Sequence, residues 1–285
     1  MNGKLKILTS MAIFGTVGIF VLFIPMASAA IAFCRGVLGC AFLLILMALT
    51  GKKPNLTDIR KNGWILAISG AAIGINWILL FEAYRHTTVA IATICYYLAP
   101  AFLTLASPLV GEKLSAKKLG CIGVALVGMV FVSGVLQGNQ SGSFMGVLLG
   151  VGAAVFYASV ILLNKKLSPI GAYDKTLCQL GAASLIIAPY LLVSGSLEFS
   201  QMTTLGWVML LVVGVVHTGF AYALYFGAIR DVNAQTAAIL SYLDPVLSIF
   251  LSALILRERL DVFSVIGAIL ILGSALYSEI PGRSK

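Results

Sequence analysis

The sequence predicts an all-α integral membrane protein with ten transmembrane helices, and three observations support this: its composition, its apolar runs and an internal repeat. Of the 285 residues, 60% are hydrophobic and 10% are charged, whereas about 25% are charged in an ordinary soluble domain. So few charges cannot cover the surface of a soluble globule of this length. The composition therefore excludes a soluble domain, a secreted disulfide scaffold and a disordered chain.

Ten apolar runs are each long enough to cross a bilayer, which takes about 20 residues per helix. They span residues 5–25, 30–50, 63–83, 88–110, 116–137, 143–164, 174–195, 204–228, 234–256 and 262–280. Basic residues precede the first run, as in a signal peptide, but its apolar core at 7–24 exceeds the usual length of about 7–15 residues. We therefore expect the first run to be a membrane span.

Two segments of the sequence repeat each other. Residues 88–100 match residues 233–245 at a constant offset of 145, and both copies continue to a short charged turn, at 111–115 and 257–261. Weaker pairs are Gly63-Trp64 with Gly206-Trp207 and Phe33-Cys34-Arg35 with Leu177-Cys178-Gln179. Self-similarity at a fixed spacing indicates an internal duplication.

The duplication predicts an N-terminal five-helix repeat, 1–137, and a C-terminal five-helix repeat, 143–285. Because five is odd, the second repeat enters the membrane from the opposite side, so the topology of the two repeats is inverted. Alternating sides along the chain collects 15 of the 19 Lys and Arg residues on one face and three on the other, while Arg35 lies within the second run. The positive-inside rule then predicts a multi-pass protein of the cell (plasma) membrane, with both termini cytoplasmic.

Inverted repeats are typical of transporters, in which one half rocks against the other and exposes a central site to each side in turn. Particular motifs agree. Residues 96–100 (Tyr-Tyr-Leu-Ala-Pro), 241–245 (Ser-Tyr-Leu-Asp-Pro), both charged turns and 33–36 (Phe-Cys-Arg-Gly) resemble the EamA-type branch of the drug/metabolite transporter (DMT) superfamily. The resemblance covers essentially the whole chain. It implies movement, mostly outward, of small metabolites such as amino acids, nucleosides or pigments, without naming the substrate.

We therefore expect a secondary-active or facilitative exporter of a small amphipathic metabolite, an amino acid or similar compound, that works by alternating access. Its expected partners are the substrate, the lipid bilayer and, if transport is coupled, protons, and it is expected to be a monomer or weak dimer. No nucleic-acid partner is expected, because the net charge of +9 is explained by loop residues that orient the chain.

Two other classes of function stay open at this point. A membrane-embedded enzyme would have to use the only clustered groups near an interface, Glu82, Arg85 and His86; we expect no enzyme. A non-transporting receptor is the second. The five cysteines lie inside apolar runs without metal-ligand spacing, and no phosphate loop is present, so we expect neither a metal nor a cofactor.

Charged side chains inside apolar runs are costly and are therefore candidate functional groups. The candidates for an ion, proton or ion-pair role are Arg35, Glu82, Asp244 and His217. Each also has a structural interpretation. Arg35 would snorkel to the interface, and Glu82 would pair with Arg85. Asp244 would cap backbone groups freed at a helix break that Pro245 imposes. His217 can titrate near neutral pH, or stay neutral and bond to a neighbouring helix.

The candidate substrate-binding residues add deep aromatic and amide side chains to these groups. They are Asn76, Trp77, Tyr96, Tyr97, Tyr157, His217, Tyr222, Tyr242 and Asp244. Tyr and Trp normally concentrate at the membrane interface, so rings at this depth favour the walls of a cavity. Plain packing and, for Asn76, inter-helix hydrogen bonding are the alternatives.

Overall fold

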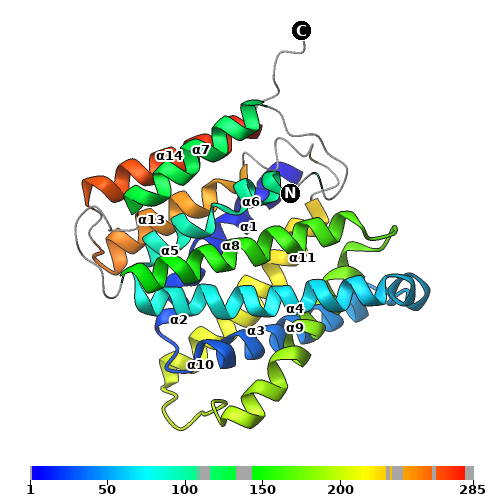
Figure 1. Ribbon diagram of the computed structural model, residues 1–285. Coiled ribbons are helices and arrows are strands. Elements are labelled where there is room, and N and C mark those ends of the chain that lie inside the picture. Colours follow the sequence, from blue (N-terminus) through cyan, green and yellow to red (C-terminus); the bar gives the residue numbers. More distant parts are fainter. Residues whose placement is uncertain are drawn as a thin grey trace.

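The computed structural model describes residues 2–106, 108, 116–132, 143–228, 232, 240–258 and 261–279. Within these residues the regular structure is entirely helical (Figure 1). The fold class predicted from the sequence is confirmed to this extent: the protein is all-α, and its helices are strongly apolar.

Six helical segments are long and apolar enough to cross a membrane. They are Gly3–Leu22 (α1, Gly3–Phe14, and α2, Val17–Leu22), α3 (Ser28–Leu49), α4 (Leu56–His86), Phe144–Lys165 in α8 (Ser143–Lys165), α9 (Ala172–Ser194), and Thr204–Tyr225 (α10, Thr204–Leu211; η3, Val212–Phe220; and part of α11, Ala221–Ala228). Shorter apolar helices follow the remaining predicted spans: α5 (Val89–Tyr96) with α6 (Ala99–Leu105), α7 (Ala116–Val132), α13 (Leu243–Ile255) and α14 (Val262–Glu279). Much of both charged turns, and the junction expected at 138–142, lie outside the described residues, so the count of ten crossings stays a prediction.

Helix α4 is longer than the apolar run that predicts it, because its start is set by polar residues. The Asn55 side chain accepts hydrogen bonds from the backbone N–H groups of Thr57 (3.2 Å) and Asp58 (3.3 Å). Such a cap satisfies donors that have no partner inside the helix, and an acidic residue in the first turn is favoured by the helix dipole. The helix therefore begins at Leu56, seven residues before the predicted span at 63.

Several predicted spans are broken rather than continuous. The first is interrupted between α1 and α2, and the fourth between α5 and α6, where Tyr97 and Leu98 leave the helix. We expect Pro245 to disturb the helix at Asp244, but α13 begins at Leu243, so both residues lie in its first turn. A proline there lacks only an N–H that would have no helical partner. The interruption falls at Tyr242 instead.

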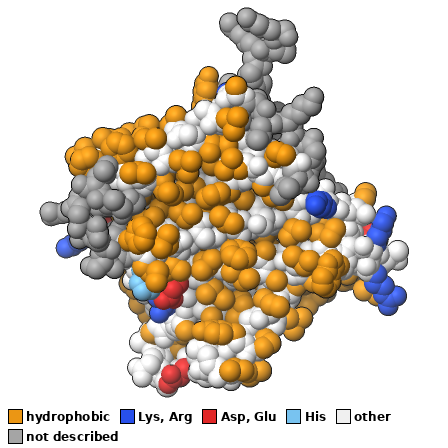
Figure 2. Space-filling model, viewed as in Figure 1, with side chains coloured by type: hydrophobic (Ala, Val, Ile, Leu, Met, Phe, Trp, Pro, Cys, Tyr) orange, Lys and Arg blue, Asp and Glu red, His pale blue; other side chains and the backbone are white. Residues whose placement is uncertain are grey.

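The helices pack in pairs across the molecule (Figure 1). Helix α4 packs against α8 and α9, α3 against α9 and η3, α1 against α11, α5 against α13, and α7 against α14. Figure 2 shows hydrophobic side chains over the middle of one face, between Lys and Arg side chains at the right edge and a small charged group at the lower left. An apolar band between charged ends is the surface expected of a protein that spans a bilayer.

Glycines allow α7 and α14 to approach closely. A Cβ at Gly267 would lie 2.5 Å from both the Gly128 carbonyl oxygen and Val132 Cγ2, and a Cβ at Gly128 would lie 2.9 Å from the Gly267 carbonyl oxygen. Small residues at such crossings let helix backbones meet in a membrane, where van der Waals packing provides much of the attraction. Gly273, six residues further along α14, would place its Cβ in open space.

We expect Gly267→Ala to destabilise the protein by about 1–3 kcal/mol, because the added methyl group has to push α7 and α14 apart. Thermal unfolding of the detergent-purified protein measures this as a lower midpoint. Gly273→Ala makes the same chemical change on the same helix without a clash and should leave the midpoint unchanged or slightly higher. Equal losses in the two variants would contradict the packing described above.

Candidate functional site

Arg35 lies deep in the bundle, between α3, α4 and η3. It is 5% exposed, and its guanidinium carbon lies 4.2 Å from the ring centre of Trp77 and 5.2 Å from that of Phe81. Its Nε donates a hydrogen bond to Thr218 Oγ1 at 3.0 Å. The side chain therefore does not snorkel to the interface. Within the described part of the chain it forms no ion pair with a carboxylate, so its charge is balanced by aromatic faces and a hydroxyl.

Thr218, which accepts the hydrogen bond from Arg35, belongs to a π-helix, η3. Thr218 Oγ1 donates to the Val213 carbonyl five residues earlier, at 2.8 Å, and His217 Nδ1 lies 3.2 Å from the Val212 carbonyl, also five residues earlier. The π-turn leaves these carbonyls within reach of side chains. Segments of this type are rare and occur often at functional sites.

His217 joins this π-helix to the break in the first span. Its Nε2 lies 2.7 Å from Thr16 Oγ1, and its ring packs 4.9 Å from that of Phe20. Thr16 Oγ1 also donates to the Ile13 carbonyl at 2.7 Å, so its one hydroxyl proton is shared between two neighbours of the side chain. His217 is only 2% exposed. It is bonded to a neighbouring helix, as its structural interpretation predicts.

Asp244 contacts the first half of the chain through a tyrosine. Tyr97 donates its hydroxyl to Asp244 Oδ2 at 2.9 Å and lies 3.4 Å from the Ser241 carbonyl. Asp244 also lies in the first turn of α13, where the positive end of the helix dipole favours a carboxylate. One turn further, Ser248 Oγ lies 3.1 Å from Thr93 Oγ1 of α5. The polar face of α13 is thus directed toward α5.

Four of the five predicted tyrosines are close neighbours, and the fifth, Tyr222, contacts Trp77. The ring of Tyr96 lies 5.3 Å from that of Tyr157 and 6.0 Å from that of Tyr97, and Tyr97 lies 6.1 Å from Tyr242. The ring of Tyr222 lies 5.3 Å from that of Phe14. Tyr157 stays 42% exposed. We call Tyr96, Tyr97, Tyr157, Tyr222 and Tyr242 the tyrosine cluster.

The tyrosine cluster connects the two charged candidates. Tyr97 bonds Asp244, and Tyr222 contacts Trp77, which stacks on Arg35. The cluster therefore lies beside an acidic group of the C-terminal half and, through Trp77, beside a cationic group of the N-terminal half.

Two predicted residues serve mainly as contacts between helices. Asn76 Nδ2 donates to the Ala153 carbonyl of α8 at 2.6 Å and is 3% exposed. Trp77 is 5% exposed, and its ring is covered by the guanidinium group of Arg35. Asn76 therefore matches the inter-helix interpretation.

Glu82 lies apart from the tyrosine cluster, at the end of α4, and the expected pair with Arg85 is wrong. Its Oε2 accepts from Ser28 Oγ at 2.6 Å, and its Oε1 lies 3.3 Å from His86 Nε2. Arg85 donates instead to the Met26 carbonyl. These contacts tie the end of α4 to the start of α3, because the connection before α3 passes over this end of the helix.

Sequence reasoning missed three residues that complete these contacts. Thr16 and Thr218 are the partners of His217 and Arg35. Glu258 accepts from the backbone N–H groups of Val89 at 2.9 Å and Ala90 at 3.3 Å, so a carboxylate of the second half caps the start of α5. The repetition of the charged turns was the one available signal for Glu258.

The Arg35–Thr218 hydrogen bond predicts a measurable coupling. In a double-mutant cycle of Arg35→Gln and Thr218→Val, followed by thermal unfolding, we expect a coupling free energy of about 1.5–3 kcal/mol, as for hydrogen bonds to charged groups. The matched control is Thr176→Val, since that buried hydroxyl bonds to the Ala172 carbonyl of its own helix. Additive effects of Arg35→Gln and Thr218→Val would contradict the contact.

Known proteins resemble this chain along its whole length. It is 29% identical over 284 residues to the uncharacterized transporter YxxF of Bacillus subtilis (strain 168), which covers 99% of this chain and 90% of that protein. It is 25% identical over 274 residues to an uncharacterized transporter of Archaeoglobus fulgidus, covering 96% and 95% of the two chains. One crystal structure aligns with 97% of this chain and 96% of its own, at a TM-score of 0.65 and 20% identity, which shows a shared fold.

The sequence model of the EamA-like transporter family matches twice, at residues 1–134 and again at 144–278. Together the two matches cover nearly all of the chain. The resemblance noted in the sequence is thereby confirmed, and the protein belongs to the EamA-like transporter family.

Proposed function

We propose that the protein exports a small zwitterionic amphipathic metabolite, an amino acid or similar compound, by alternating access. The moving parts would be two inverted repeats, 1–137 and 143–285. The double match to one family model supports the duplication. So does the packing, because helices that correspond under the repeat lie against each other: α3 with α9, α5 with α13, and α7 with α14.

One observation carries the substrate class: Asp244 bonds Tyr97 of the tyrosine cluster, Trp77 stacks on Arg35, and among the described residues the two charged groups form no ion pair with each other. A zwitterion presents a carboxylate and an ammonium group at once. The carboxylate would displace part of the aromatic contact of Arg35, and the ammonium group would meet Asp244, while the phenols hydrogen-bond the remainder. Putting opposite charges on opposite halves would let the substrate draw the halves together.

The same arrangement explains how the substrate would be held and released. Closure of the two halves would bury the carboxylate and the ammonium group of the substrate. Reopening on the far side would return both groups to water, where release is favoured. Asp244 is the group through which a proton gradient would act, because a carboxylate that binds a proton loses its attraction for an amine. His217 is already satisfied by Thr16 and Val212, so we assign it no proton.

The geometry favours transport over the enzymatic alternative. The cluster of Glu82, Arg85 and His86 is engaged with Ser28 and with the Met26 carbonyl. These groups connect the end of α4 to the start of α3, which is a structural role. We therefore propose no reaction at this cluster.

Substrate counterflow in proteoliposomes tests the site. Free amino acids are first screened by thermal shift of the purified protein, and a stabilising amino acid is then used as the radiolabelled substrate. We expect Asp244→Asn and Arg35→Gln each to reduce counterflow about ten-fold or more, the worth of one charged hydrogen bond. Glu198→Gln, which changes an exposed carboxylate in the connection after α9, is the matched control and should transport normally. Full counterflow in both site variants would refute the proposed site.

A pH gradient across the same vesicles tests coupling. If Asp244 carries a proton, an imposed gradient drives uphill movement of the substrate in the wild-type protein and not in Asp244→Asn. A wild-type flux that ignores the gradient identifies a facilitator and leaves the binding site intact. The two measurements therefore separate failure of coupling from failure of the site.

A further inference from the structure

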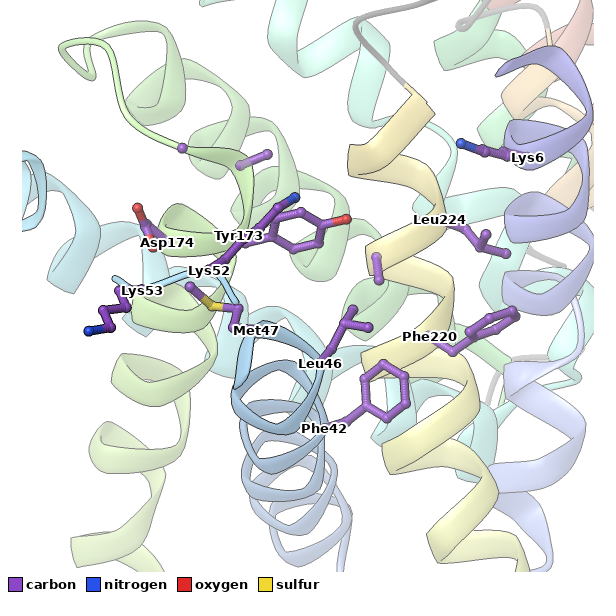
Figure 3. A pocket seen from close by; sticks show the side chains of 13 residues that line it. Lys6, Phe42, Leu46, Met47, Lys52, Lys53, Tyr173, Asp174, Phe220 and Leu224 are labelled. Carbon is purple, nitrogen blue, oxygen red and sulfur yellow. The ribbon is translucent and has the colours of Figure 1, made fainter. Parts of the chain in front are cut away.

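A cavity of about 720 Å³ lies away from the tyrosine cluster, where α3 ends and α9 begins. Helices α1, α3, α9 and α11 surround it, and Figure 3 shows the side chains that line it. Its volume falls within the range of small-ligand sites, about 300–1,000 Å³. Neither the candidate site nor the proposed transport step uses it.

Three lysines from two separate segments line this cavity. Lys6 lies on α1, and Lys52 and Lys53 lie on the connection after α3; Lys52 is directed toward Tyr173, and Lys53 points outward (Figure 3). The Lys52 ammonium lies 4.7 Å from the ring centre of Tyr173, a contact that holds it at the mouth of the cavity. Lys52 and Lys53 are exposed and Lys6 is half-buried, so the mouth of the cavity carries accessible positive charge.

One carboxylate is present, and it does not cancel this charge. Asp174 is 8% exposed, its Oδ2 accepts from the Asn55 backbone N–H at 3.3 Å, and its Oδ1 is buried. It lies in the first turn of α9, where the positive end of the helix dipole offsets a carboxylate. The lysines therefore outnumber the acid and are more accessible than it is.

The remaining walls are apolar. Phe42 and Leu46 of α3, Phe220 of η3, and Ala223 and Leu224 of α11 line the cavity. On α3, Ile45 and Leu49 are 60% and 82% exposed, so the cavity wall continues into surface that would face lipid. A small soluble anion would gain nothing from these walls, whereas an acyl chain would be buried against them.

We propose that this cavity binds an anionic phospholipid. The phosphate would lie at the lysine-lined mouth of the cavity, beside Lys52, and one acyl chain would follow Phe42 and Leu46. Basic pockets between transmembrane helices are the sites at which anionic head groups bind, and this end carries the basic residues that the positive-inside rule assigns to the cytoplasmic leaflet. The inference is independent of the proposed transport activity.

Lipid-dependent thermal stability of the detergent-purified full-length protein tests the proposal. Phosphatidylglycerol is titrated against phosphatidylcholine of the same acyl chains, since a ligand that binds the folded state raises the unfolding midpoint. We expect the wild-type protein to bind phosphatidylglycerol more tightly than phosphatidylcholine. Lys52→Gln/Lys53→Gln should weaken that binding about 30-fold, the worth of two lysines at an anionic surface. Lys6→Gln should weaken it as well, since Lys6 also lines the cavity.

The chain provides a charge-matched control. Arg60→Gln/Lys61→Gln also removes two positive charges, from exposed positions in the first turns of α4 that do not line the cavity. It should leave the preference for phosphatidylglycerol unchanged. An equal loss in this control, or no lipid preference in the wild-type protein, would overturn the proposal. So would full competition by glycerol 3-phosphate, because that result would identify a soluble-anion site instead.

Discussion

A guanidinium inside a lipid-embedded bundle has no water around it, so protein groups must supply every favourable contact. Arg35 meets this constraint with two aromatic faces and one hydroxyl, and each contact fixes a neighbour. Trp77 and Phe81 determine which face of α4 turns toward α3. Thr218 determines the rotation of η3 against α3. The relative orientation of three helices thus depends on one buried positive charge.

The apolar runs predicted the helices well, because membrane length and hydropathy are local properties of a sequence. They could not predict that α4 starts at Leu56, since its first turns are polar and its start is set by the cap at Asn55. The site was predicted as a set of deep polar residues but not as contacts. Glu82 had a plausible partner in Arg85, and only the path of the chain before α3 decided that Ser28 takes its place.

Pro100 and Pro245, which match under the repeat, show where a local sequence rule differs from the folded structure. Sequence alone indicates a disturbed helix near Pro245, because it lacks a donor, and Pro100 is the matching residue of the first half. Each proline instead lies in the first turn of a new helix, so the unwound residues are the preceding Tyr97 and Tyr242, whose rings meet at 6.1 Å. At these positions the prolines cost their own helices no hydrogen bond. The rings of Tyr97 and Tyr242 lie next to each other between the two halves.

The π-helix accounts for a numerical mismatch between the two halves. Gly63 and Gly206 are 143 residues apart, whereas Thr88 and Asn233 are 145 apart, so the second half holds two more residues between the same landmarks. That interval contains η3, and a turn closed by i→i+5 bonds holds one more residue than an α-turn. The wide turns can therefore absorb the added residues without a longer span. The contact between Arg35 and Thr218 is unequal between the halves for a second reason, because the residue that matches Arg35 in the other half is Gln179.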